Sequence, residues 1–406
     1  MMLVATLGVA GCSDRERANP LDPRNRTTAG SPSGFTAVAL SGQVLLSWNS
    51  SPGLSVQVFR RADGDTDFVA ISTVLPPRNT LFTDSNAPND VTYHYRLHFV
   101  VAQAITGPPA TAVATPSRVV AWAIDAGRGS LLRLAADGRE IAFEEPGFGR
   151  PVHLALDRVN DLVWVADPDG DRVVIYVASL GIRINVPGFL EPSVVAIDPG
   201  DGSAWISDFN DNVVRHVLRS GSPGTPAEIS PLDGPLGVDV DVQTRALWVC
   251  ERRAGRVRRY SSDGLPLGSA AMTAPSRVAT DSANGEGWVT SFATGTLLHL
   301  AADLTTLHAI NSLRGPVGVA VDPRRGRIWV ADPAAAQVIA FRRDGSEEFR
   351  IGGLAGARDV AVELASGEGW VTRDGAVTRI TAGGTVIVSS RGLSAPMAVG
   401  LDRVAP

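Results

Sequence analysis

The chain has 406 residues, of which 44% are hydrophobic and 19% charged, and its formal net charge is -5. These proportions are those of an ordinary globular protein, and the small negative charge excludes the basic surface that nucleic-acid binding needs. No stretch offers the roughly eighteen consecutive apolar residues of a membrane-spanning helix. The 42 glycines and 27 prolines fit a turn-rich all-β fold, and the length allows two or three domains.

The chain begins with a short apolar stretch, residues 1–11, that runs directly into Cys12. Residues 9–12, Val-Ala-Gly-Cys, resemble the lipobox of bacterial lipoproteins, which is cut before a cysteine that then carries the lipid. An apolar run that ends in small residues fits a signal segment and its cleavage site. The run is short and no Lys or Arg precedes it, as expected if translation starts upstream of Met1. The alternative interpretation is a disordered N-terminus with a chance cysteine.

Residues 12–31 are rich in proline, glycine and charge, so they are predicted to form a flexible, solvated tether. Similar tethers follow the lipidated cysteine of bacterial surface lipoproteins, and Ser13 after Cys12 resembles the class that is sorted to the outer membrane. The resemblance implies a protein anchored by lipid in the bacterial cell envelope, at the outer membrane or the cell surface. The other cysteine, Cys250, lies in a different region, so no internal disulfide framework is expected.

Residues 32–116 contain short runs of alternating apolar and polar residues separated by turn residues. Several short strands in a segment of this size predict a β-sandwich. Trp48 and the run from Tyr93 to Leu97 resemble the core tryptophan and the Tyr-x-Tyr-Arg-Val strand of fibronectin type III domains. That resemblance implies a spacer or an adhesion module.

Seven tryptophans recur at nearly constant intervals across residues 117–406. They are Trp122, Trp164, Trp205, Trp248, Trp288, Trp329 and Trp370. A period of about 40 to 45 residues is typical of β-propellers, in which each repeat forms one four-stranded blade. We interpret these tryptophans as packing between blades and not as ligand-stacking aromatics.

The clearest repeat spans residues 315–353 and contains four predicted strands, a to d. The turns between them are short, so neighbouring strands must be antiparallel. The repeat resembles the NHL repeat, whose signature joins Gly-Val-Ala-Val-Asp to an aromatic-Val-Ala-Asp strand, here residues 318–322 and 329–332. Weaker copies extend over residues 118–402, so the resemblance covers the whole array.

The strand count predicts seven blades. The Trp122 strand has no strand a before it, and the last strand a, residues 397–402, has no strand b after it. The C-terminal strand is therefore predicted to pair with the Trp122 strand and close the ring, which removes exposed strand edges. NHL propellers commonly have six blades, so a seventh departs from the family pattern.

The start of each strand a and the end of each strand b are expected to lie on one face of the ring, where propellers bind ligands at a central funnel. Acidic residues end strand b in five repeats, at Asp125, Asp167, Asp208, Glu251 and Asp332. Because they recur, these carboxylates are predicted to have a structural role, accepting backbone N–H groups in the following turn.

Polar residues that break the repeat are the candidate ligand-binding residues. His153, Arg277 and Asp359 start strand a where other copies have Gly, Val or Ala, and Glu251 and Arg373 break the pattern at the end of strand b. We expect Arg277 and a protonated His153 to hold an anionic or sugar-like ligand, with Asp359 orienting a donor. The alternative is an exposed polar rim that binds nothing.

Catalysis and metal binding have weaker support. Gluconolactonase-like hydrolases bind a divalent metal at the funnel, and streptogramin lyase-like propellers use histidine and acidic groups, but His153 is the only histidine expected there. Asp167, Asp169 and Asp171 form a weak calcium candidate. Cys250 is expected to be buried and inert, and no cofactor is predicted.

The predicted function is that of a lipid-anchored envelope protein whose propeller binds a protein, peptide or glycan without catalysis. Its expected partners are the membrane, through the lipid, and that ligand, while nucleic acid is excluded. One rival is a propeller hydrolase or lyase that uses His153 and nearby carboxylates. The other is a purely structural component of the envelope.

Overall fold

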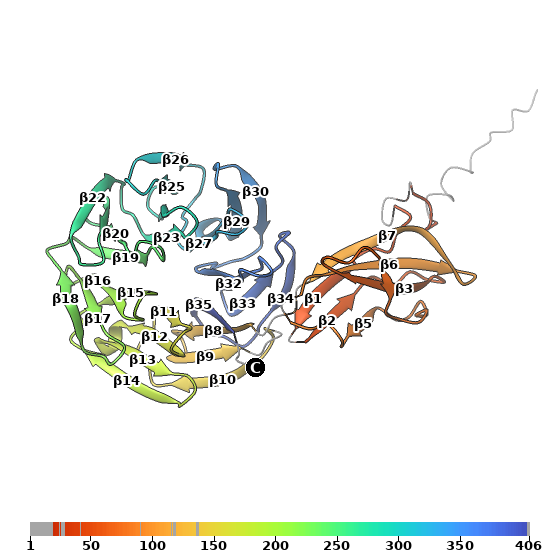
Figure 1. Ribbon diagram of the computed structural model, residues 1–406, viewed down its shortest axis with the longest axis horizontal. Coiled ribbons are helices and arrows are strands. Elements are labelled where there is room, and N and C mark those ends of the chain that lie inside the picture. The colour runs from red at the N-terminus through yellow and green to blue at the C-terminus, as the bar shows by residue number, and fades with distance from the viewer. Residues whose placement is uncertain are drawn as a thin grey trace, which may run out of the picture. The chain divides into compact units, whose positions relative to one another are not determined.

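The structure is a computed structural model that describes residues 19–23, 25, 29–40, 42–89, 91–114, 116, 119–134 and 138–403. In this described part the chain is all-β, with two short 3-10 turns and no helix long and apolar enough to cross a membrane. The chain divides into two compact units, Met1–Arg118 and Val119–Pro406 (Figure 1). The predicted signal segment 1–11 and lipidation site Cys12 lie outside the described residues.

The first unit contains two antiparallel sheets, with strand orders β1-β2-β5 and β4-β3-β6-β7. The strands are β1 (Thr36–Leu40), β2 (Gln43–Ser47), β3 (Ser55–Ala62), β4 (Val69–Ala70), β5 (Leu81–Asp84), β6 (Tyr93–Val101) and β7 (Ala104–Ala114). Alternate residues of β2, β3 and β6 are buried, which is the pattern of strands with one face on a core.

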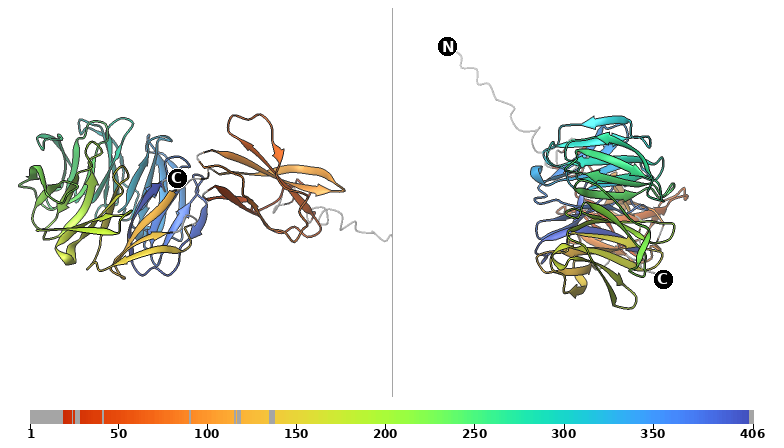
Figure 2. Two further views of the ribbon diagram at one scale, coloured as in Figure 1. Left: turned by 60° about the horizontal axis from the view of Figure 1, so that its bottom comes forward. Right: turned by 90° about the vertical axis from the view of Figure 1, so that its left-hand side faces the viewer.

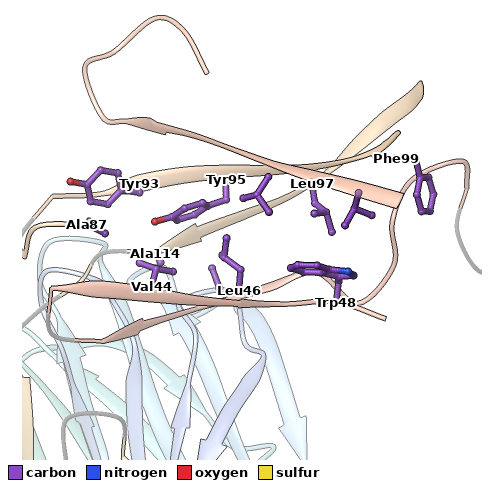
Figure 3. Close-up of a cluster of buried hydrophobic side chains, with 12 residues drawn as sticks. Val44, Leu46, Trp48, Ala87, Tyr93, Tyr95, Leu97, Phe99 and Ala114 are labelled. Carbon is purple, nitrogen blue, oxygen red and sulfur yellow. The ribbon is translucent and has the colours of Figure 1, made fainter. Parts of the chain in front are cut away.

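The core of the first unit lies between these two sheets (Figure 3). Trp48 is buried beside Val44 and Leu46, and opposite them β6 contributes Tyr95 and other inward residues. The hydroxyl of Tyr95 donates a hydrogen bond of 2.9 Å to the buried carboxylate of Asp84. The unit is therefore a two-layer β structure with a satisfied polar group in its core.

The described part of the predicted tether is folded onto the first unit. Leu21 packs against the core of the first unit, and Asn25 is buried. The backbone N–H of Ala29 donates to the carbonyl of Asn25, and the N–H of Asn25 donates to that of Asp22. The expectation of a solvated tether over residues 12–31 is thus wrong for these residues. Burial of the apolar Leu21 side chain against the adjacent core is favourable in free energy and holds the segment there.

The second unit contains seven four-stranded antiparallel sheets in its described residues, and in each the strands follow the order a-b-c-d. The a strands are β35 (Pro396–Arg403), β11 (His153–Asp157), β15 (Pro192–Ile197), β19 (Pro235–Val240), β23 (Arg277–Asp281), β27 (Val319–Asp322) and β31 (Val360–Val362). The b strands are β8 (Val119–Asp125), β12 (Leu162–Asp167), β16 (Ala204–Asp208), β20 (Leu247–Glu251), β24 (Glu286–Ser291), β28 (Arg327–Asp332) and β32 (Gly369–Arg373).

The c and d strands complete each sheet on its outer side. The c strands are β9 (Ser130–Leu134), β13 (Arg172–Val177), β17 (Val213–Val217), β21 (Arg256–Tyr260), β25 (Thr296–Leu300), β29 (Gln337–Arg342) and β33 (Ala376–Ile380). The d strands are β10 (Ile141–Pro146), β14 (Ile182–Pro187), β18 (Pro223–Ile229), β22 (Pro266–Ala271), β26 (Thr306–Ile310), β30 (Glu347–Gly352) and β34 (Val386–Ser389). The 3-10 turns η1 (Pro168–Gly170) and η2 (Pro333–Ala335) follow strand b in two sheets.

The sheets of the second unit stand side by side in a ring, with the a strands innermost (Figures 1 and 2). The C-terminal strand β35 pairs antiparallel with β8, and Gly400 lies opposite Trp122 in the register. The predicted pairing between residues 397–402 and the Trp122 strand is therefore present. It joins the two ends of the array in a single sheet.

The repeated tryptophans are core residues, as predicted, and each is at most 2% exposed. Trp329 shows the arrangement: it packs with Val360 and Val362 of the next sheet, and a Cβ on Gly369 of that sheet would lie 2.8 Å from the indole. A small residue on one sheet thus makes room for the indole of its neighbour. The tryptophans hold adjacent sheets together and do not face a ligand.

Candidate functional site

The seven a strands surround the centre of the ring, and each leads to an acidic residue. These acids are Asp157, Asp198, Asp241, Asp281, Asp322, Glu363 and Asp402. The residue four positions before each acid belongs to a first level of inner side chains, and the residue two positions before it to a second level. The two levels lie on the same strand face, roughly 7 Å apart along the strand, because the period is two and the rise is about 3.3 Å per residue.

A cavity of about 270 Å³ lies among these strands and is lined by His153, Arg277 and Asp359 of the first level. The structure thus brings together the three strand-a residues singled out in the sequence. Around the ring, Arg277 stands three sheets beyond His153, and Asp359 stands two sheets beyond Arg277. This spacing distributes the three side chains around the opening, so that a group at the centre faces all of them.

Two of these side chains also tie neighbouring a strands together. Nδ1 of His153 accepts the backbone N–H of Val195 at 3.2 Å, and Oδ2 of Asp359 accepts that of Val399 at 3.0 Å. Strand a is the inner edge of its sheet, so its outward N–H groups need partners that the sheet does not supply. His153 and Asp359 therefore have a structural role as well as a position on the cavity.

Asp239 is a fourth charged residue of the cavity, on the second level. Its Oδ2 accepts the backbone N–H of Thr280 at 2.7 Å and the Thr280 hydroxyl at 2.8 Å, and its Oδ1 accepts the N–H of Val240 at 3.0 Å. Burial raises the pKa of Asp239 to about 6. Asp239 is not among the predicted site residues because those were selected at the starts of the a strands. Asp239 lies two residues after the first level and is the only charged residue at its position in the seven repeats. The other repeats have Ala155, Ala196, Ala279, Ala320, Ala361 and Gly400 there.

Arg277 is the unpaired charge of the cavity. Within the described residues its guanidinium makes no hydrogen bond and no ion pair, although Asp359 is close enough to interact with it electrostatically. Its first-level neighbours on both sides are glycines, Gly237 and Gly318, which offer no side chain to pair with it. A Cβ on Gly237 would lie 2.8 Å from the Cα of Arg277, so this glycine permits the close approach of the two strands.

His153 is neutral in this site, which corrects the expectation of a protonated imidazole. Burial holds the pKa of His153 well below its usual range, and the positive charge of Arg277 lowers it further. Because Nδ1 accepts the Val195 N–H, the neutral ring carries its proton on Nε2. His153 therefore presents an N–H donor to the cavity and no positive charge.

Glu251 and Arg373 do not line this cavity, which corrects their assignment to it. The carboxylate of Glu251 is fully buried and pairs with Arg256 at 2.9 Å and Arg258 at 2.8 Å on the adjacent strand c. The guanidinium of Arg373 donates to the hydroxyl of Thr378 at 2.7 Å. Both side chains are directed into their own sheets, because strand c supplies partners within reach.

The acidic residues that end strand b are structural, as predicted, but most of their partners lie in the loop before strand a. Asp332 accepts the N–H groups of Arg314 at 2.9 Å and Gly315 at 3.0 Å. It also accepts the N–H of Ala335, in the turn that follows strand b. Such carboxylates anchor the loop that leads into the cavity strands.

The calcium candidate is engaged in the same way. Asp167 accepts the N–H groups of Gly149 and Arg150 and pairs with Arg172, while Asp169 pairs with Arg150 at 2.9 Å. No group of three or more His, Cys, Asp or Glu side chains in the described part of the chain is placed to hold a metal ion. The set Asp167, Asp169 and Asp171 thus has no geometry that supports calcium.

Two histidines outside the cavity and Cys250 lie away from solvent. His216 stacks on Trp205 with ring centroids 4.3 Å apart, and His299 stacks on Trp288 at 3.8 Å. Cys250 is fully buried in β20, and burial raises the pKa of its thiol. A thiol in that environment is a poor nucleophile, so the expectation of a buried cysteine is confirmed.

Comparison with solved structures shows a β-propeller. A functionally unknown protein from Desulfotomaculum acetoxidans matches 70% of this chain and 99% of its own, with 16% identity and a TM-score of 0.60. A putative 6-phosphogluconolactonase from Bacteroides uniformis matches 70% of this chain and 99% of its own, with 9% identity and a TM-score of 0.57. A streptogramin B lyase matches 60% of this chain and 83% of its own, with 15% identity and a TM-score of 0.52.

No family model and no curated protein matches the chain. The solved structures therefore carry the comparison, and at these identities they show the fold alone. They do not test the resemblances to NHL repeats, fibronectin type III domains or lipoproteins. The chemistry of this chain has to be argued from its own cavity.

The raised pKa of Asp239 predicts that part of the stability is lost as pH rises. The folded pKa of about 6 exceeds the ordinary value of 3.8, so the folded state holds the proton longer than the unfolded state. Stability from this group is present below about pH 4 and is lost between pH 4 and 6, by roughly 3 kcal/mol. Urea denaturation of the wild type and of Asp239→Asn at several pH values measures it. A constant difference between the two proteins from pH 4 to 7 would contradict the shift.

Proposed function

We propose that this protein is a lipid-anchored binding protein of the bacterial cell envelope. In this proposal a fibronectin type III-like sandwich carries a seven-bladed, NHL-like propeller, and the propeller binds a protein, peptide or glycan without catalysis. The ligand places one small group in the central cavity between His153, Arg277 and Asp359. The sandwich acts as a spacer between the membrane and the propeller.

The observation that carries this proposal is the unpaired guanidinium of Arg277 in a cavity that it shares with two carboxylates and a neutral imidazole. Arg277 is half-buried, and a charge drawn out of bulk water is costly unless it is paired, so a site that leaves one unpaired is expected to receive a partner from outside. His153 and Asp359 each accept a backbone N–H from the neighbouring strand a, which gives them a structural role. Arg277 makes no hydrogen bond of this kind within the described residues. The fold itself therefore does not explain the presence of Arg277, whereas a ligand would.

Binding is favoured over catalysis by the state of His153. A general base needs a free ring nitrogen, but Nδ1 already accepts the Val195 N–H and the neutral ring then carries a proton on Nε2. The streptogramin lyase and the putative 6-phosphogluconolactonase share the propeller fold with this chain, and this likeness does not extend to their activities. A purely structural role remains the outcome if no ligand enters the cavity.

Substitutions in the cavity test the proposed function. After a glycan and peptide array has identified a ligand, Arg277→Ala should weaken its binding by about 2–5 kcal/mol, the usual loss for one partner of a desolvated charged contact. Asp359→Asn should weaken it as well while keeping an acceptor for the Val399 N–H. Calorimetry measures both, with Arg342→Ala on the exposed end of β29 as the control. Unchanged affinity in both cavity variants would place the site elsewhere.

Lipid anchoring through Cys12 is supported by the sequence of residues 9–12. Expressed in a bacterium that is supplied with a fatty-acid probe, the protein should become labelled and enter the membrane fraction. Cys12→Ala should abolish both, whereas Cys250→Ala, at a buried thiol, should leave labelling intact. Labelling that survives Cys12→Ala would rule out this anchor.

A further inference from the structure

Hydrogen-bond donors and acceptors alternate around the cavity, in the order His153, Asp239, Arg277 and Asp359. Arg277 brings a guanidinium whose N–H donors make no hydrogen bond within the described residues, and His153 adds its Nε2–H. Asp359 accepts the backbone N–H of Val399 through one oxygen, lies within hydrogen-bonding reach of the N–H of Val360, and keeps further lone pairs for a donor. Donors and acceptors stand on different sheets of the ring, so one ligand can meet both sets at once.

The charged groups of the cavity decide which ligand suits it. Arg277 is positive and His153 is neutral, while Asp359 and Asp239 bring two carboxylates whose pKa is raised by burial. A simple anion would pair with Arg277 but add a third negative group to two carboxylates. A simple cation would pair with a carboxylate but leave Arg277 uncompensated. Asp239 already accepts three donors from Thr280 and Val240, so Arg277 and Asp359 are the groups left for a ligand. A ligand with both charges pairs these two without adding net charge.

The size of the cavity limits the ligand further. At about 270 Å³ it is smaller than the roughly 300–1,000 Å³ of sites for drug-sized molecules. Most of the remaining lining is aliphatic and includes Val195, Val238 and Val319. The hydroxyl of Thr280, which also lines the cavity, donates its hydrogen bond to Asp239. The space fits a small molecule or the end of a larger one.

From these observations we infer that the cavity binds a small zwitterion with one carboxylate and one ammonium group, the chemistry of a free amino acid. The carboxylate accepts from Arg277 and from Nε2–H of His153, and the ammonium donates to Asp359, with Asp239 one level further along the channel. Paired N–H donors of a guanidinium match the two oxygens of a carboxylate. The inference rests on the proposed function and narrows its ligand class, which the sequence predicts to be anionic or sugar-like.

The test uses matched probes that differ in one charge. Glycine and L-alanine are the zwitterions, N-acetylglycine lacks the ammonium, glycinamide lacks the carboxylate, and glucose is the uncharged control. Calorimetry on the full chain at pH 7.5 should show binding of a zwitterion, at least about tenfold tighter than N-acetylglycine, glycinamide or glucose.

Two variants test separately how the protein recognises the carboxylate and the ammonium group of the ligand. Arg277→Gln should weaken zwitterion binding at least about thirtyfold and remove the preference over glycinamide, because the carboxylate is no longer recognised. Asp359→Asn should remove the preference over N-acetylglycine, because the ammonium is no longer recognised. The amide oxygen of Asn still accepts the Val399 N–H, and a circular dichroism melt of each variant confirms that it is folded.

Each other outcome overturns the inference in a distinct way. If N-acetylglycine binds as tightly as glycine, the site is an anion site, and if glycinamide does, it is a cation site. Binding of glucose alone, or of none of the probes, also contradicts a zwitterion site. In these cases the proposed function stands if the ligand found by array still depends on Arg277 and Asp359. If a zwitterion binds the wild type and both variants equally, it binds outside the cavity, and the proposed function loses its binding site as well.

Discussion

Replacing Trp329 by alanine is expected to destabilise the protein by roughly 3–5 kcal/mol, the usual range for emptying a buried aromatic site. The indole is fully buried and packs with Val360 and Val362 of the next sheet, so its loss opens a void between two sheets. It also meets Phe349 edge to face, with ring centroids 5.2 Å apart. Urea denaturation followed by far-ultraviolet circular dichroism measures the change without depending on tryptophan fluorescence.

Two controls separate packing from other effects of this substitution. The indole nitrogen of Trp329 has no hydrogen-bond partner in the described structure, so Trp329→Phe loses no bond and should cost well below the alanine change. Phe292 is 46% exposed, and Phe292→Ala should have a smaller effect than Trp329→Ala. A loss below about 1 kcal/mol for Trp329→Ala would contradict the core assignment and revive a ligand-stacking role.

The architecture of the second unit was predictable because its signals are local and repeated. Each tryptophan marks a strand b, and short turns allow only antiparallel neighbours. The unmatched strands at the two ends implied the pairing of β35 with β8, which the structure contains. An unpaired strand at each end would expose edges, so the chain pattern and the physics of sheets favour the same answer.

The cavity was predictable only in part. His153, Arg277 and Asp359 were found because they interrupt a repeat at equivalent positions, and ring geometry then brings them together. The charge of His153 was not predictable, because it depends on burial and on Arg277 across the cavity. Asp239 was detectable by comparing the second level of each strand, where it alone carries a charge.

Glu251 and the tether show where position in the sequence misleads. Glu251 interrupts a run of aspartates, but its longer side chain is neutralised by Arg256 and Arg258 on the neighbouring strand and not by a ligand. Leu21 lies in a segment with the composition of a linker, yet one apolar side chain beside an accessible core is enough to attach it. The composition of a segment does not reveal individual side-chain contacts, and in both examples such contacts determine the structure.

Deleting residues 395–406 is expected to have the largest effect of all. The deletion removes β35, whose Ala398, Val399 and Leu401 are at most 5% exposed, and leaves strand β8 as an unpaired edge. Burying a Val or Leu side chain contributes roughly 1.5–3 kcal/mol, and each lost backbone hydrogen bond about 1 kcal/mol. The total is comparable with the roughly 5–15 kcal/mol that stabilises a typical protein, so we expect an unfolded or aggregated second unit.

The loss also reaches groups outside the deleted strand. Asp125 would lose the N–H of Ala395, which it accepts at 2.8 Å, and Asp359 would lose the N–H of Val399. The fully buried carboxylate of Asp125 would then have fewer donors to balance its charge. The deletion therefore disturbs a cavity residue as well as the ring.

A rescue experiment distinguishes loss of strand pairing from a general effect of truncation. Light scattering and thermal melts should show aggregation of the truncated chain. A synthetic peptide of residues 394–406 should restore the melting temperature in a concentration-dependent way, because it can add as the missing strand beside β8. A scrambled peptide of the same composition should not. If the chain truncated at 395 melts like the full protein, the ring does not depend on this pairing, and its stability must come from packing between the sheets alone.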